Sequence, residues 1–179
     1  LLDREDLKDY DSAMRALLAI QSIDFEQRNV VISHQFVMAG TEKPVMGGSE
    51  TTVGGIGQID ANVFDGFDYV ALGHIHNPQN IKGSDGKVRY SGTPLPVTFD
   101  EVYDHSVTLV EIAARGESPV QSEVHIDNIH PLVSLPAEGF ATWDEAKKLL
   151  EKFSSDKVSY IRLNIEVEDF LPSDAEMTS

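Results

Sequence analysis

The sequence contains no cysteine among its 179 residues, so a disulfide-stabilised scaffold is excluded and a reducing, cytoplasmic location is expected. No apolar run approaches the roughly 20 residues of a membrane-spanning helix. No basic and apolar leader of the secretory type opens the chain, and we expect no contact with a membrane. Hydrophobic residues make up 41% of the sequence, which is enough for a packed core.

Basic residues are also scarce. The chain has 14 lysines and arginines against 30 acidic residues, which gives a formal net charge of −16 at pH 7. A surface that binds nucleic acid needs lysine and arginine to neutralise phosphates. The composition therefore argues against a broad nucleic-acid-binding surface. Any contact with a polyanion must be local, made through a bound metal or supplied by a partner, and solubility explains most of the charge.

A nucleotide-binding glycine loop is missing as well. Residues 40–58 are rich in Gly, Thr and Ser, but no GxGxxG motif follows a strand and no lysine stands at the P-loop spacing. We expect a long loop there, because loops of this length in compact domains are usually functional or mobile.

Hydrophobic periodicity predicts a mixed α/β (α+β) chain. An apolar stripe predicts an amphipathic helix at 8–22, with Asp11 or Ser12 as its N-cap. Continuous apolar runs predict buried strands at 30–32, covered on both faces, and at 69–72. Further strands are predicted within KVRYSGTPLPVTF (87–99) and HSVTLVEIAA (105–114).

The remainder of the chain is predicted to form a small α+β appendage. It begins at a linker near residue 114 and contains a strand at 120–128. A helix is predicted to start at Thr142, with Glu145 in the capping-box position three residues on. A long alternating strand is predicted at 157–169. The predicted domains are therefore 1–113 and 114–179.

Three histidines directly follow the predicted buried strands. His34 ends the first strand, and His74 and His76 follow Gly73 at the end of the second. If these strands are parallel neighbours, their carboxyl ends share one edge of the sheet, which is where open α/β sheets place ligands. Histidine is the commonest metal ligand, so the pattern predicts a metal site. A single histidine after a strand is, however, more often a hydrogen-bonded structural residue.

Other polar residues give weaker signals. Asn77, just after the histidines, could contact a phosphate, although a polar turn explains it as well. The remaining histidines, His105, His125 and His130, lack a comparable context, so we expect them to face solvent or to pack.

The segments NVVISHQF, FDYVALGHIHNPQ and VRYSGTPLPVTFDE resemble the later motifs of the calcineurin-like metallophosphoesterases. Within them, SHQFV, FDYVALGH and YSGTPL are similar to the SbcD-type nuclease subunits of bacterial SbcCD complexes. The resemblance covers nearly all of residues 9–112, and the tail resembles that family's capping domain. It implies the C-terminal half of a metallophosphoesterase β-sandwich flanked by helices, plus a small α+β capping domain.

The resemblance also implies a dinuclear metal site, usually filled with manganese. His34 and His74 would bind one ion and His76 the other, with Asn77 and Ser91 beside the substrate. The family's earlier motifs, which are Asp-x-His, Gly-Asp-x-x-Asp and Gly-Asn-His followed by Asp or Glu, do not occur in this sequence. We therefore expect the catalytic residues to lie outside this chain, which starts at Leu1, and expect the chain alone to be inactive.

The function implied is that of a metal-dependent DNA exonuclease and endonuclease acting at DNA ends in repair and recombination. The implied partners are an SbcC-type ATPase and double-stranded DNA ends, with a homodimer inside a heterotetramer. Two alternatives stay open. One is a calcineurin-like phosphoesterase that acts on small phosphate esters, and the other is a non-catalytic module that binds a partner or DNA.

Overall fold

The computed structural model describes residues 7–46, 50 and 57–167, which form two compact units divided between Ile126 and Asp127. The predicted division after residue 113 differs from this one. Strand β8 (Val120–His125) pairs antiparallel with β7 (Ser106–Glu111) along its whole length, so β8 belongs to the first unit. The described residues mix helices with several small sheets, as predicted from the periodicity.

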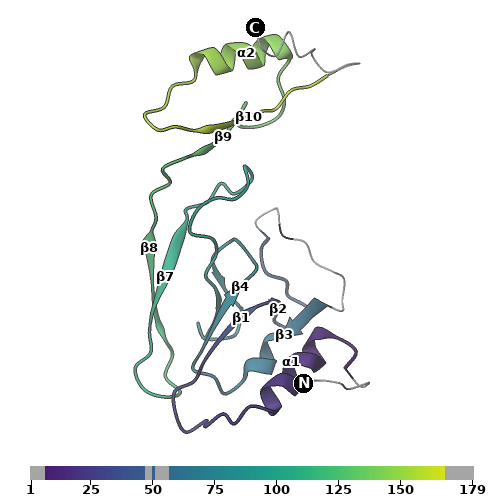
Figure 1. The fold of residues 1–179 in the computed structure, drawn as a ribbon, viewed down its shortest axis with the longest axis vertical. Coiled ribbons are helices and arrows are strands. Elements are labelled where there is room, and N and C mark those ends of the chain that lie inside the picture. The colour runs from purple at the N-terminus through teal and green to yellow at the C-terminus, as the bar shows by residue number, and fades with distance from the viewer. Residues whose placement is uncertain (1–6, 47–49, 51–56, 168–179) are drawn as a thin grey trace. The chain divides into compact units, whose positions relative to one another are not determined.

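The centre of the first unit is a four-stranded sheet in the order β1-β4-β6-β5, and Figure 1 shows β1 beside β4. Three neighbouring strands are parallel and the fourth is antiparallel: β1 (Val30–His34), β4 (Tyr69–Gly73), β6 (Val88–Tyr90) and the antiparallel β5 (Gln79–Asn80). The register sets His34 opposite Gly73. The carboxyl ends of β1 and β4 therefore meet at one edge of the sheet, as the sequence predicts.

The two apolar strands differ in burial. β4 is buried as predicted, with Val70 and Leu72 each 1% exposed. The prediction that both faces of β1 are covered is wrong for the described structure, because Val30 is 52% and Ile32 86% exposed. Val30, Ile32 and His34 alternate along β1 and therefore share one face of the strand, and all three are exposed.

A second, parallel pair of strands packs beside this sheet. β2 (Phe36–Met38) is wholly buried and pairs with β3 (Gln58–Asp60), which leads into the 3-10 helix η2 (Ala61–Phe64). The buried hydroxyl of Tyr90 accepts a 2.6 Å hydrogen bond from the backbone N–H of Val37, and so joins β6 to β2. Burial raises the pKa of Tyr90 to about 12.

Helix α1 (Tyr10–Ala19) packs against β3 and η2. The predicted N-cap is wrong, because the cap is Asp9. Its carboxylate accepts a 2.7 Å hydrogen bond from the N–H of Ser12, whose hydroxyl completes a capping box. Asp11 instead accepts a hydrogen bond of 2.9 Å from the backbone N–H of Asp60. Its carboxylate therefore ties the helix to β3.

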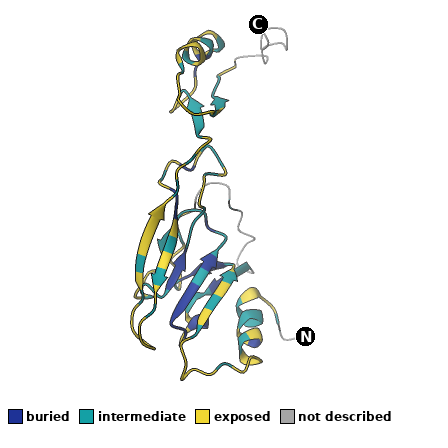
Figure 2. Cartoon of the chain, turned by 60° about the vertical axis from the view of Figure 1, so that its left-hand side comes forward, coloured by how far each residue is buried: buried dark blue, intermediate teal, exposed yellow. Residues whose placement is uncertain are grey.

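Asp68 fastens the β7–β8 hairpin to the starts of β1 and β4. Its carboxylate, in a residue only 2% exposed, accepts hydrogen bonds from the backbone N–H groups of Gly116 (2.6 Å) and Asn29 (2.8 Å). The hydrogen bond from Gly116, and after it the one from Asn29, holds the pKa of Asp68 below its usual value, with Gly116 contributing the larger effect. The hairpin strands themselves are largely exposed (Figure 2).

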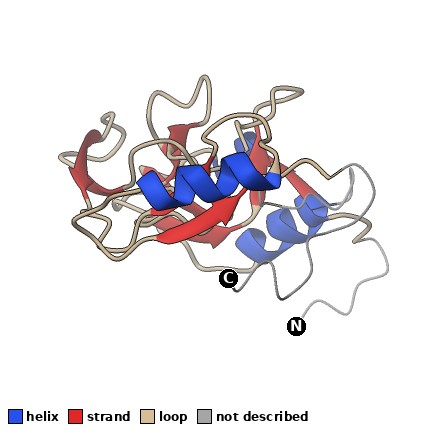
Figure 3. Ribbon diagram, turned by 90° about the horizontal axis from the view of Figure 1, so that it is seen from above, coloured by secondary structure: helices blue, strands red, loops and turns tan. Residues whose placement is uncertain are grey.

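The described residues of the second unit form two parallel strands and one helix; strands are red and helices blue in Figure 3. β9 (Leu132–Leu135) pairs with β10 (Tyr160–Leu163), and α2 (Trp143–Lys152) contacts β9. The predicted capping box of Thr142 and Glu145 is confirmed, because each side chain bonds the other residue's backbone N–H. No helix in the described ranges is both long enough and apolar enough to span a membrane.

Two predicted segments are only partly described. β10 is shorter than the strand predicted at 157–169, because residues 157–159 and 164–167 lie outside β10, and residues 168–169 lie outside the described residues. Within the loop predicted at 40–58, residues 47–49 and 51–56 also lie outside them. The strands β2, β3 and β9 have no counterpart in the predicted set, because they are only three or four residues long.

Candidate metal centre

His34 and His74 lie together at the carboxyl edge of the parallel strands. Their rings are arranged edge to face, with centroids 5.6 Å apart and planes at 70°. His34 is the last residue of β1 and lies opposite Gly73, which His74 follows directly. A Cβ at position 73 would stand only 2.7 Å from Nδ1 of His34. The absence of a side chain there lets the His34 ring lie over the end of β4.

The backbone turns sharply at His74, where φ is 102°. This is a left-handed conformation that costs a residue other than glycine on the order of 1–3 kcal/mol and often marks functional sites. Burial, and then the neighbouring imidazole of His34, lower the pKa of His74. The lowered pKa favours the neutral ring, whose free nitrogen lone pair is the form that binds a metal.

His76 is held from two sides. Nδ1 of its ring lies 2.8 Å from Oε1 of Glu101, and its backbone N–H donates a 2.6 Å hydrogen bond to the carboxylate of Glu50. Ile75, between the two histidines, is 1% exposed and belongs to the hydrophobic core. Burial of Ile75 anchors the turn, while the side chain of His76 stays 24% exposed.

The loop after β6 packs against this turn. Gly92 has a φ of 74°, and a Cβ there would stand 2.7 Å from the backbone oxygen of His76. Thr93 donates its backbone N–H to the same oxygen at 3.0 Å. Ser91 donates its N–H to the carbonyl of Leu72 at 3.1 Å, and so lies at the edge that carries the histidines. Contact between Ser91 and a substrate stays a prediction.

Asn77 lies in the turn that leads to β5. Its carbonyl accepts a 3.0 Å hydrogen bond from the side-chain amide of Gln79, which also bonds both backbone groups of Val45. These bonds give the segment the polar-turn character that was one of the two interpretations of Asn77. Its contact with a phosphate stays a prediction.

Glu101 is the main residue of this region to which the sequence pattern gave no role. The residue is 6% exposed and accepts hydrogen bonds from the backbone N–H of Val97 (3.1 Å) and the hydroxyl of Thr98 (3.2 Å), besides its contact with His76. It closes the segment VRYSGTPLPVTFDE, which already carries the resemblance. That segment was the available signal, but periodicity cannot show that a glutamate in a turn is buried.

The other histidines divide into two kinds. His125 and His130 are exposed, as expected. His105 is 7% exposed and packs against Tyr103, with ring centroids 4.9 Å apart. Burial and the nearby carboxylates of Glu101 and Glu50 raise the pKa of Tyr103 to about 12. His105 is thus a packing residue, and it lies beside the buried carboxylate of Glu101. The neighbouring residues in the sequence do not indicate this position.

The residues present fit part of a metal site. Within the described ranges, no three His, Asp or Glu side chains are grouped so that they could hold one ion. His34 and His74 offer a pair of adjacent imidazoles, and His76 offers a third beside them. Imidazole nitrogen suits divalent transition metals. The three imidazoles therefore provide only part of a metal site, whose remaining ligands would come from groups outside this set.

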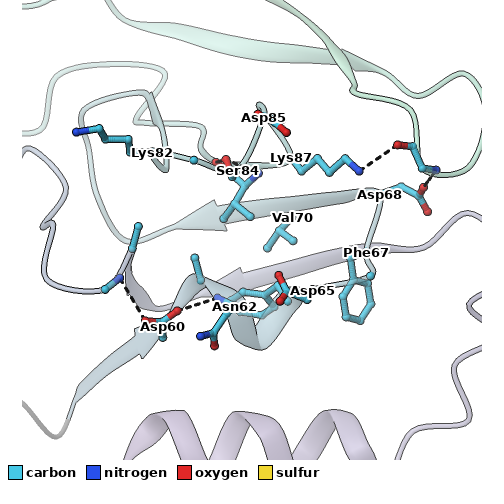
Figure 4. A pocket seen from close by; sticks show the side chains of 18 of the residues that line it. Asp60, Asn62, Asp65, Phe67, Asp68, Val70, Lys82, Ser84, Asp85 and Lys87 are labelled. Carbon is cyan, nitrogen blue, oxygen red and sulfur yellow. Dashed lines mark hydrogen bonds between the residues drawn. The ribbon is translucent and has the colours of Figure 1, made fainter.

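A large pocket of the first unit lies elsewhere. It has a volume of about 590 Å³ and is lined by residues at the amino ends of β4 and β6, including Asp68, Val70 and Lys87 (Figure 4). The candidate metal residues lie at the opposite, carboxyl ends of these strands. Several of its polar groups already bond within the protein, such as Lys87 to the carbonyl of Gly116 at 3.1 Å. The pocket therefore adds nothing to the histidine site.

Comparison with known proteins gives a consistent result. No protein-family model matches the chain. The chain is 35% identical over 183 residues to the SbcD subunit of the SbcCD nuclease from Bacillus subtilis, an alignment that covers 94% of this chain and 43% of that protein. It is 36% identical over 118 residues to the corresponding SbcD subunit from Rhodobacter capsulatus, with 65% and 26% covered. The chain thus spans less than half the length of these relatives, and the resemblance to SbcD-type nuclease subunits is confirmed over nearly all of the chain.

Proposed function

We propose that this chain is part of an SbcD-type, metal-dependent phosphodiesterase that hydrolyses DNA ends. The observation that carries the proposal is the adjacency of His34 and His74 at the carboxyl edge of parallel strands, with His76 two residues further on. The similarity to subunits named as SbcCD nucleases supports the same interpretation. In this proposal the unit 1–126 belongs to a calcineurin-like phosphoesterase domain and the tail to a capping domain.

In the proposed site, His34 and His74 hold one divalent ion and His76 holds the second, with manganese the expected metal. When bound, such a pair of ions supplies the positive charge that a phosphodiester needs to be attacked. The chain's own groups support these ligands: burial favours the neutral ring of His74, and Glu101 contacts the ring of His76. In this proposal Asn77 and Ser91 contact the substrate.

The proposed partners follow from the same similarity and from the charge of the chain. An SbcC-type ATPase would form the complex implied by the relatives' names, with a homodimer of this subunit inside it. The net charge of −16 leaves little basic surface for DNA, so the ions and the ATPase subunit would provide most of the contact with phosphates.

The test compares variants of the complete protein that contains this chain. His74→Ala and His76→Ala should each lower manganese-dependent cleavage of a linear duplex by on the order of 100-fold or more, since each loses a metal ligand. DNA binding and thermal melting should stay close to wild type. Wild-type cleavage by His74→Ala at limiting manganese would refute the assignment.

The control is His125→Ala, an exposed histidine on β8, which should leave cleavage unchanged. His105→Ala is unsuitable as a control, because His105 is buried behind Glu101. The 179-residue chain by itself should bind manganese weakly and cut no DNA, because its described residues provide no three-ligand group. Tight binding of two ions by this chain, measured by isothermal titration, would refute that expectation.

A further inference from the structure

A buried carboxylate lies directly behind one of the candidate metal ligands. The side chain of Glu101 is fully buried, and its Oε1 lies 2.8 Å from Nδ1 of His76. Burial of a carboxylate is costly unless hydrogen bonds compensate for lost hydration. The N–H of Val97 and the hydroxyl of Thr98 provide such bonds, from a loop that also packs on the backbone of His76 through Thr93.

The chemistry of this contact fixes the proton on the imidazole. An ionised carboxylate only accepts hydrogen bonds, so the contact requires His76 to carry its hydrogen on Nδ1. The lone pair of the neutral ring then lies on Nε2, at the far side of the ring from Glu101. Three further groups hold the carboxylate in place, namely the N–H of Val97 and the hydroxyls of Thr98 and Thr93. The contact therefore fixes the ring plane of His76 together with its tautomer.

His105 closes the other side of the carboxylate. Its Nδ1 lies 2.9 Å from the backbone oxygen of Thr93, which only accepts, so this nitrogen carries the hydrogen. Its Nε2 faces Oε2 of Glu101 at 3.9 Å, beyond hydrogen-bond distance. Within ion-pair distance of Glu101, the described residues place two basic groups, which are these two imidazoles. No described lysine or arginine pairs with it.

We propose that Glu101 is a positioning residue, which sets the tautomer and ring orientation of His76 so that Nε2 can bind a divalent cation. The proposal rests on the proposed function, because it takes His76 as a metal ligand. A carboxylate behind a ligating histidine orients the ring and raises its basicity, and loss of such a partner typically weakens metal binding about 10–100-fold.

The test uses the complete metal-free protein labelled with ¹⁵N in its histidines. Long-range ¹H–¹⁵N NMR should show the hydrogen of His76 on Nδ1, with the signal assigned by its loss in His76→Ala. A hydrogen on Nε2 would overturn the proposal. This measurement needs neither metal nor catalysis, and a merely structural role for Glu101 does not demand one tautomer. It also decides the matter if variants at position 101 fail to fold.

The second arm measures manganese binding to Glu101→Gln, which keeps the size of the side chain but can present either an oxygen or an NH₂ group to His76. The dissociation constant of one ion should rise by about 10–100-fold, while the other ion binds as in wild type. The matched control is Glu42→Gln, which breaks the surface ion pair with Lys82 (3.0 Å) and should change neither constant.

The outcomes separate this proposal from the proposed function. Wild-type protein that binds no manganese and cuts no DNA overturns both. Wild-type binding of two ions, with unchanged affinities in folded Glu101→Gln, overturns only the role of Glu101. Selective loss of one ion in Glu101→Gln, combined with the Nδ1–H tautomer in wild type, supports both.

Discussion

Gly73→Ala should damage the proposed metal site while leaving the fold nearly intact. The new Cβ would stand 2.7 Å from Nδ1 of His34, whereas ordinary contact begins at 3.4 Å, so the ring must retreat by about 0.7 Å or change rotamer. His34 is exposed at the end of β1, so its ring is free to move outward. Alanine is also preferred to glycine in a strand by roughly 0.5–1 kcal/mol, which offsets part of the cost.

The free energy of unfolding should therefore change by less than about 1 kcal/mol. The ligand geometry should suffer far more, because a misplacement near 1 Å at a reacting centre can cost on the order of 100-fold. We expect manganese affinity and manganese-dependent cleavage by the complete protein to fall by about 10–100-fold. Urea unfolding, isothermal titration with manganese and duplex digestion would measure these three quantities.

The control is the same substitution in a His34→Ala background. Without the imidazole, the alanine at position 73 has nothing to displace, so Gly73→Ala should add no further loss of metal affinity. Equal losses in both backgrounds would refute the steric argument. A drop in stability of several kcal/mol in the single variant would refute it too, because it would mean that the backbone moves rather than the ring.

Two further predictions concern stability. Asp68→Asn should lower the free energy of unfolding by about 1–3 kcal/mol at pH 7. The amide NH₂ would face one of the two backbone N–H groups that now donate hydrogen bonds to the buried carboxylate. Since the folded-state pKa of Asp68 is lowered, its stabilisation is present above the unfolded pKa near 4 and is lost as the pH falls through the lowered value. Urea titrations from pH 7 to pH 3 should show wild type and variant converging, and parallel curves would contradict this. Thr142→Ala should cost about 1 kcal/mol in the second unit by removing the N-cap of α2, detectable as a lower melting temperature, whereas Thr142→Ser should retain the cap.

The strands that bear histidines could be predicted because their signals are local. Residues 69–72 form a continuous apolar run, and that run is buried in β4. The parallel pairing of β1 with β4 entered the sequence analysis only as a condition, and the structure meets that condition. The capping box at Thr142 was also predictable, since three-residue spacing to Glu145 determines it.

Burial of β1 could not be predicted from its own residues. An apolar run indicates that a strand is suited to burial, but exposure depends on which neighbours are present. In the described structure Val30 and Ile32, which share one face of β1, are 52% and 86% exposed. The N-cap of α1 failed for a different reason: Asp9, Asp11 and Ser12 are all good caps, and Asp11 is used instead to bind the backbone of Asp60.

The supporting residues of the site were hidden for a third reason. Glu101 and His105 follow β6 in a segment without periodicity. Glu101 becomes a neighbour of His76, and His105 a neighbour of Glu101, only through the packing of the loop after β6. A glutamate in such a loop is normally exposed. Its burial is a tertiary property, and the same holds for the contact between Gly92 and the backbone of His76.

The charge of the chain and the geometry of the site argue in the same direction. Two carboxylates contact His76: Glu50 accepts its backbone N–H, and Glu101 lies against its ring. Paired negative charges at one edge of a sheet attract cations and repel phosphate. Under the proposed function, in a chain with a net charge of −16, contact with a phosphodiester at this edge would therefore depend on cations bound to the imidazoles. The acidic composition, which by itself argues against nucleic acid, is consistent with a site where metal ions come first and the substrate second.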